Sequence, residues 1–193
     1  MTGRAVLIAA LLLAGVICPL SMPAADSPLE EIYVLRSIRE PRAPTADGCA
    51  AATTGFAPFP MDAERFFSLW SVRSRPEDGR IVEAQAARVA ELRGCFGPTG
   101  EPARRNFYAE IRLGSIAFRG RGECLALRID VPEPGLFPVR CQLVLEDLPP
   151  PFVGGLLTTN TITSRAPFGG ESDPPGYTQA SLATIRLWRA RAQ

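Results

Sequence analysis

The chain of 193 residues carries 21 basic and 20 acidic side chains, and it contains no histidine and no lysine, so every basic residue is arginine. The absence of histidine excludes Ser-His-Asp and Cys-His catalysis and histidine-ligated metals or haem. The absence of lysine excludes Schiff-base chemistry and the P-loop. The near-zero net charge creates no field that attracts nucleic acid. The composition therefore predicts no metal, no cofactor and no nucleic-acid partner, and arginine in place of lysine is typical of a GC-rich bacterial genome.

Residues 1–25 have the order of a secretory signal peptide. Arg4 precedes an apolar run over residues 5–17, and prolines and small residues follow. The run is shorter than the roughly 20 apolar residues that a membrane-spanning helix needs. We expect cleavage within residues 21–26. This leaves residues 26–193 as a single domain without a membrane span, in the periplasm or outside the cell.

The first half of this domain is predicted to mix strands with helices. Residues 32–38 form an apolar, β-favouring run that predicts a first strand. Residues 61–70 fit either a short helix with Asp62 as its N-cap or the start of a strand. Residues 81–92 permit a strand, but their apolar spacing, alanines and acidic residues favour a helix. We therefore expect one or two short helices before residue 95.

The pattern from residue 106 onward is that of β-strands. Apolar residues alternate with polar ones, as in a half-buried strand, at Phe107, Ala109, Ile111 and Leu113. A turn is expected at residues 120–122, and further strands over residues 152–163 and 178–189. About six to eight hairpin-linked strands predict a mainly β fold. We expect an antiparallel β-barrel of the general calycin or lipocalin type, with a β-sandwich as the alternative.

Four cysteines follow the expected signal peptide, and an even number in an exported chain predicts two disulfides. Cys124 and Cys141 stand nearly equidistant from the turn-forming residues 131–135, whose sequence is VPEPG. Folding the chain back at this turn places the two cysteines opposite each other, with Cβ atoms roughly 4.5–5.5 Å apart. This spacing suits a disulfide after a small adjustment. The second predicted pair, by elimination, is Cys49 with Cys95.

The candidate ligand-binding residues lie on one strand and one loop. Thr158 and Asn160 belong to a threonine-rich strand whose polar groups are candidates to line a pocket, although threonine also suits an exposed strand face. Glu171 and Asp173, with Tyr177 nearby, lie in a long loop whose carboxylates are candidates for acid–base chemistry or calcium binding. Acidic residues beside glycine and proline are more often solvated turn residues.

The arginines divide into two groups by their surroundings. Arg128 and Arg186 lie within apolar strands, so we expect them to be the ones that point inward and hold a charged ligand group. Most of the others, including the C-terminal cluster with Arg189, are expected to form surface ion pairs because the acidic residues are equally numerous.

These observations predict an exported barrel that binds a small, apolar ligand. Two alternatives stay open: a cofactor-independent enzyme of the cyclase or isomerase type that uses the barrel pocket, and a module that binds a protein partner in the cell envelope. A cavity of about a few hundred Å³ favours the ligand-binding and enzyme hypotheses over the interaction module. A tyrosine or carboxylate with a displaced pKa in that cavity favours the enzyme.

Overall fold

The computed structural model describes residues 29–45, 47–56, 60–84, 86–127, 136–164 and 180–190. The elements in this part of the chain are β1 (Leu29–Glu40), α1 (Ala50–Thr53), the 3-10 turn η1 (Thr54–Phe56), β2 (Ala63–Ser71), β3 (Arg73–Ser74), β4 (Ile81–Glu83), β5 (Arg88–Pro98), β6 (Arg104–Leu113), β7 (Ile116–Ala126), β8 (Leu136–Glu146), β9 (Phe152–Ser164) and β10 (Ala180–Arg189).

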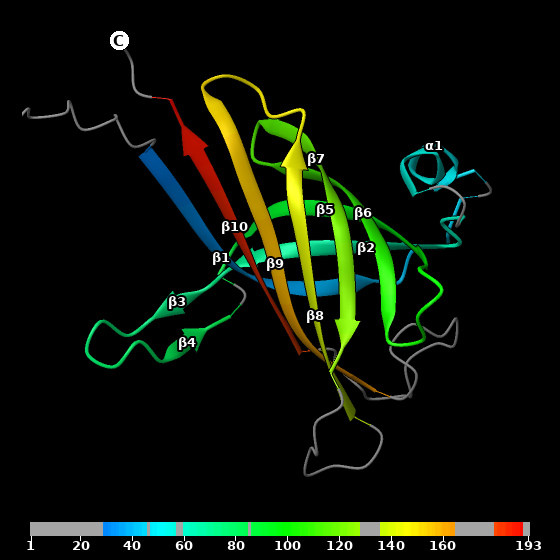
Figure 1. Cartoon of the computed structure of the whole chain (residues 1–193). Coiled ribbons are helices and arrows are strands. Elements are labelled where there is room, and N and C mark those ends of the chain that lie inside the picture. The colour runs from blue at the N-terminus through cyan, green and yellow to red at the C-terminus, as the bar shows by residue number, and fades with distance from the viewer. Residues whose placement is uncertain are drawn as a thin grey trace, which may run out of the picture.

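Eight of these strands close into an antiparallel barrel in the order β1-β10-β9-β8-β7-β6-β5-β2 (Figure 1). Each barrel strand pairs with the next barrel strand along the chain, and β10 closes the barrel by pairing with β1 from Leu29↔Arg189 to Ser37↔Ser181. This is an up-and-down arrangement, in which each of the eight barrel strands has a described neighbour on both sides. The predicted antiparallel barrel is confirmed, and the sandwich alternative is wrong.

Alternate side chains of each barrel strand point into the interior, as the period of a strand requires. The residues at the waist are fully buried leucines and isoleucine: Leu69, Leu143, Leu157, Ile185 and Leu187. Toward one end, the rings of Phe96 and Phe107 stack with their centroids 4.4 Å apart. The waist of the barrel is therefore packed by side chains.

The two segments whose sequences fit a helix form strands in the structure. Residues 61–70 contribute most of β2, and residues 81–92 contribute β4 and the first half of β5. In β5, Ala90 and Leu92 point inward and Glu91 points to solvent, a strand alternation that the alanine-rich sequence hides. Pairing with β2 on one side and β6 on the other outweighs the helix propensity. The short helical segments before residue 95 are instead α1 and η1.

The prediction of a turn at residues 120–122 is also wrong, because Gly120 and Gly122 both lie inside β7. A Cβ added at Gly122 would collide with the carbonyl oxygen of Gln142 on β8. Glycine is thus used here for close approach of two strands and not for a turn. The chain reverses earlier, at Gly114, whose φ of +56° suits glycine.

Both predicted disulfides are present. Cys124 and Cys141 lie directly opposite each other on β7 and β8, with a Cα–Cα distance of 3.9 Å. Cys49 and Cys95, with a Cα–Cα distance of 5.6 Å, fasten the β1–β2 connection to the outside of β5. Beneath this connection a second apolar cluster lies outside the barrel, formed by Cys49, Ala52, Met61, Cys95 and Tyr108.

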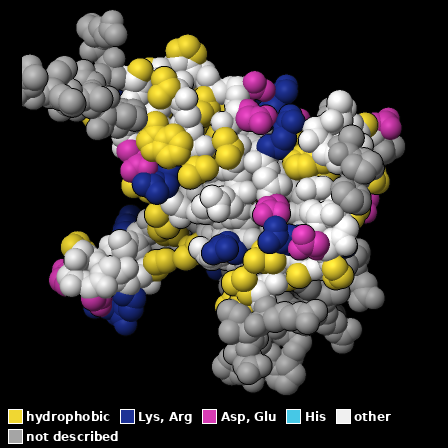
Figure 2. All heavy atoms as spheres, in the orientation of Figure 1, with side chains coloured by type: hydrophobic (Ala, Val, Ile, Leu, Met, Phe, Trp, Pro, Cys, Tyr) yellow, Lys and Arg dark blue, Asp and Glu magenta, His cyan; other side chains and the backbone are white. Residues whose placement is uncertain are grey.

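Strands β3 and β4 pair with each other as a separate two-stranded sheet. This hairpin projects from the barrel body in the ribbon view (Figure 1) and in the space-filling view (Figure 2). Within the described part of the chain, no helix combines the length and the apolarity needed to cross a membrane.

Candidate functional site

A cavity of about 650 Å³ opens at the end of the barrel where β1 begins and β10 ends. We call it the mouth pocket. Its rim is formed by the β6–β7 turn at Gly114 and Ser115, by Pro150 and Pro151 before β9, and by the end of β2. The mouth pocket therefore has the concave form of a small-molecule site.

The floor of the mouth pocket is apolar and continuous with the barrel core. Leu35 and Leu113 line it and are buried. Val89, Ile116 and Phe152 also line it, and they pack as partly buried residues against the core cluster. An apolar ligand that enters here would extend the core, and each Å² of apolar surface that it buries contributes about 25 cal/mol.

One polar cluster stands at the wall of this pocket: Glu31, Tyr33 and Arg189. The Tyr33 hydroxyl donates a hydrogen bond to Glu31 Oε2 at 2.6 Å, and Arg189 Nε lies 2.7 Å from Glu31 Oε1. The Arg189 guanidinium lies 5.1 Å from the ring centroid of Phe152. Glu31 and Tyr33 share the inward face of β1 with Leu35, and Arg189 reaches them because β10 pairs with β1.

The electrostatics of Tyr33 follow from this arrangement. The hydrogen bond to Glu31, and after it burial, raises the pKa of Tyr33 above its ordinary value. The phenol therefore stays protonated at neutral pH and donates its hydrogen to Glu31, while its oxygen keeps lone pairs that accept hydrogen bonds.

Replacing Glu31 with glutamine is expected to lower the pKa of Tyr33, because it removes the charged acceptor and leaves Arg189 in place. The matched control is Glu110→Gln beside Tyr108. For Tyr108 burial is the largest cause of the raised pKa, so its pKa should move less. Titration of the two tyrosines by NMR of their ζ carbons measures both values. An unchanged Tyr33 pKa in Glu31→Gln would contradict the hydrogen bond.

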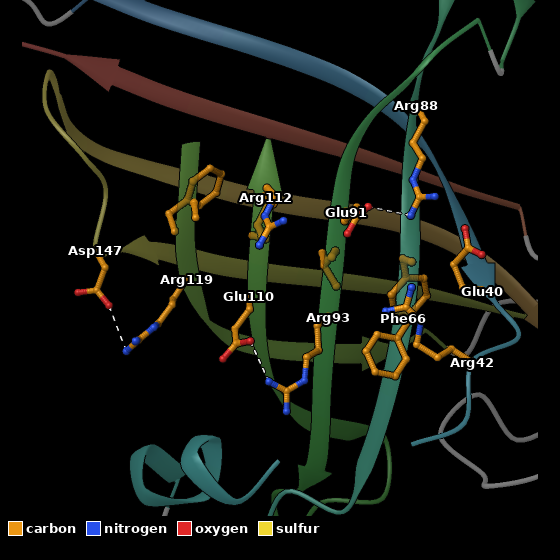
Figure 3. Close-up of a pocket in the computed structure, with 15 residues that line it drawn as sticks. Glu40, Arg42, Phe66, Arg88, Glu91, Arg93, Glu110, Arg112, Arg119 and Asp147 are labelled. Carbon is orange, nitrogen blue, oxygen red and sulfur yellow. Dashed lines mark hydrogen bonds and ion pairs between the residues drawn. The ribbon is translucent and has the colours of Figure 1, made fainter. Parts of the chain in front are cut away.

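A second cavity, of about 450 Å³, is a groove on the outer wall of β2, β5, β6 and β7 (Figure 3). Six of its nine charged side chains form ion pairs with one another: Arg88 with Glu91 at 3.1 Å, Arg93 with Glu110 at 2.8 Å, and Arg119 with Asp147 at 3.3 Å. Such exposed pairs already satisfy most of the charges that a ligand would use. The outer groove is therefore the weaker candidate.

The structure places the predicted strand residues on the outer wall. Thr158 and Asn160 alternate with the buried Leu157 and Thr161 on β9, and Asn160 is exposed. Arg186 was expected to point inward, and this is wrong: Ile185 and Leu187 fill the interior, so Arg186 faces outward and binds Glu30 at 2.6 Å. Arg128, Glu171, Asp173 and Tyr177 lie outside the described residues.

The residues of the mouth pocket were not among the sequence candidates. Glu31 and Tyr33 belong to an ordinary strand pattern, and Arg189 to a cluster expected to form surface ion pairs. The usable signal was the spacing of Glu31, Tyr33 and Leu35, which places all three on one face of a strand. Within the described part, no three acidic or cysteine side chains come together to hold a metal ion.

No family model, curated protein or solved structure matches the chain.

Proposed function

We propose that this protein binds a small, largely apolar ligand in the mouth pocket. The observation that carries the proposal is the form of the cavity: it opens to solvent at one end, its floor is formed by apolar residues of the core, and its lining includes a polar cluster. Its volume of about 650 Å³ falls in the range usual for small-molecule sites.

The proposal includes export from the cytoplasm. Two disulfides in one small domain favour an oxidising compartment. The charge, apolar run and small residues of the first 25 residues agree with this location. An exported barrel with an open end is suited to carrying or retaining a compound of low solubility.

The neutral fluorescent probe N-phenyl-1-naphthylamine tests this proposal. We expect saturable binding at one site, and we expect Ile116→Trp to abolish most of it because the larger side chain fills the pocket from its floor. The matched control is Val144→Trp, on the exposed outer face of β8, which should leave binding unchanged. Equal binding by the wild type and Ile116→Trp would overturn the assignment of the site.

The enzyme hypothesis has one observation in its favour, the displaced pKa of Tyr33 inside the cavity. The direction of the displacement argues against acid–base catalysis, because a general acid or base works best with a pKa near the operating pH. The pKa of Tyr33 is instead raised, away from neutrality. Ligand binding is therefore the function that the site supports best.

A further inference from the structure

Some hydrogen-bonding groups at the wall of the mouth pocket are paired with each other, and others are available to a ligand. Glu31 Oε2 accepts a hydrogen bond from the Tyr33 hydroxyl, and Glu31 Oε1 forms an ion pair with Arg189 at 2.7 Å. The Arg189 side chain is 42% exposed and carries five N–H donors, and within the described part of the chain its Nε atom has no hydrogen-bond partner. The pocket thus offers guanidinium N–H donors beside a phenol oxygen that accepts. A ligand hydroxyl, which both accepts and donates, complements this pair of groups.

The charges of the cluster cancel locally. Glu31 and Arg189 carry opposite charges 2.7 Å apart. An anionic ligand group near Arg189 would also be near Glu31, and a cationic group near Glu31 would also be near Arg189. Either charge would lose its hydration on entering the pocket with little net Coulomb attraction in return. A neutral polar group has a smaller desolvation cost and keeps its hydrogen bonds.

The position of the cluster orients the ligand. Arg189 lies over the ring of Phe152 at the wall, whereas the buried Leu35 and Leu113 form the floor. An amphiphile therefore places its chain inward and its polar end beside Arg189 and Tyr33.

Resting on the proposed function, we infer that the mouth pocket selects neutral amphiphiles: compounds with an apolar chain that ends in a hydroxyl, in preference to the same chain ending in a carboxylate or an ammonium group.

Three ten-carbon probes with different ends test this selectivity. Decan-1-ol, decanoate and decylammonium are compared at pH 7 by displacement of N-phenyl-1-naphthylamine from the wild-type protein. We expect decan-1-ol to displace the probe at about a tenfold lower concentration than either charged compound, a difference of ~1.4 kcal/mol. Equal displacement, or preference for a charged compound, would overturn the inference. Failure of the naphthylamine itself to bind would instead overturn the proposed function.

Reciprocal variants of the ion pair provide the second measurement. Glu31→Gln leaves Arg189 without its charged partner. The affinity for decanoate should therefore rise about tenfold and exceed the affinity for decylammonium. Arg189→Met leaves the charge of Glu31 without its partner, so this variant should bind decylammonium more tightly than decanoate, the reverse of the order expected in Glu31→Gln. The matched controls are Glu30→Gln and Arg186→Met, which break the neighbouring ion pair on the outer face. Two results would contradict the assignment of this cluster. One is a selectivity that shifts equally in the control variants, and the other is a selectivity that shifts in neither Glu31→Gln nor Arg189→Met.

Discussion

Replacing Cys49 and Cys95 together with alanine is expected to lower the free energy of unfolding by about 4 kcal/mol. This bond joins residues 46 positions apart, so it closes a long loop and restricts the unfolded chain strongly. It also fastens the β1–β2 connection over the second apolar cluster, which would loosen once the bond is lost.

The Cys124–Cys141 disulfide provides the comparison. It closes a loop with a separation of only 17 residues, and its loss should cost about 3 kcal/mol. Both sulfurs lie in buried surroundings in each pair, so the cavity left by alanine is similar. Chemical denaturation of the two double variants measures the difference. A smaller loss for the Cys49–Cys95 variant than for the Cys124–Cys141 variant would contradict this ranking.

Replacing Glu64 with alanine is expected to lower the free energy of unfolding by about 2–3 kcal/mol, because a hydrogen bond to a charged group contributes about 1.5–3 kcal/mol. Glu64 is only 4% exposed. Its Oε2 accepts hydrogen bonds from the Thr45 backbone amide at 2.6 Å and the Thr45 hydroxyl at 3.0 Å, and its Oε1 accepts one from Arg93. Glu64 thus holds the β1–β2 connection against the barrel from beneath.

Glu110→Ala is the matched control, since Glu110 binds the same Arg93 side chain at 2.8 Å but is 41% exposed. An exposed pair contributes up to about 1 kcal/mol, so the control should cost far less. Denaturation of both variants by urea measures the two losses. Equal losses would show that Glu64 has no special role in the fold.

The contribution of Glu64 should also depend on pH. Burial alone would raise the pKa of Glu64, but the hydrogen bonds from Thr45 and Arg93 outweigh burial and lower it. A carboxylate with a lowered pKa in the folded state stabilises the protein fully above its unfolded pKa. This stabilisation is lost as the pH falls through the folded pKa. The difference between wild type and Glu64→Ala should therefore be large at pH 7 and shrink in acid.

The parts of the fold that were predictable from sequence are those set by neighbours along the chain. Residues 131–135 lie outside the described part of the chain, but their turn-favouring sequence and its equal distances to Cys124 and Cys141 predict the disulfide-linked pair of strands that is observed. The strands at residues 61–70 and 81–92 were harder, because their pairing partners outweigh a local preference for helix.

The residues of the mouth pocket could not be predicted from the sequence for a similar reason. Glu31 and Arg189 come from the first and last strands, and only closure of the barrel between β1 and β10 brings them together. Arg186 is a second example of a residue whose position could not be predicted from the sequence. Its place in an apolar strand indicated an inward charge, but the register of β10 decides which alternate residues face the core.

The most direct test of the ligand-binding claim is a crystal structure of the protein soaked with decan-1-ol. We expect the alkyl chain to lie between Leu35, Leu113 and Phe152, with the hydroxyl beside Arg189 and Tyr33. A ligand found only in the outer groove of Figure 3, or a mouth pocket that stays free of decan-1-ol at saturating concentration, would contradict the claim.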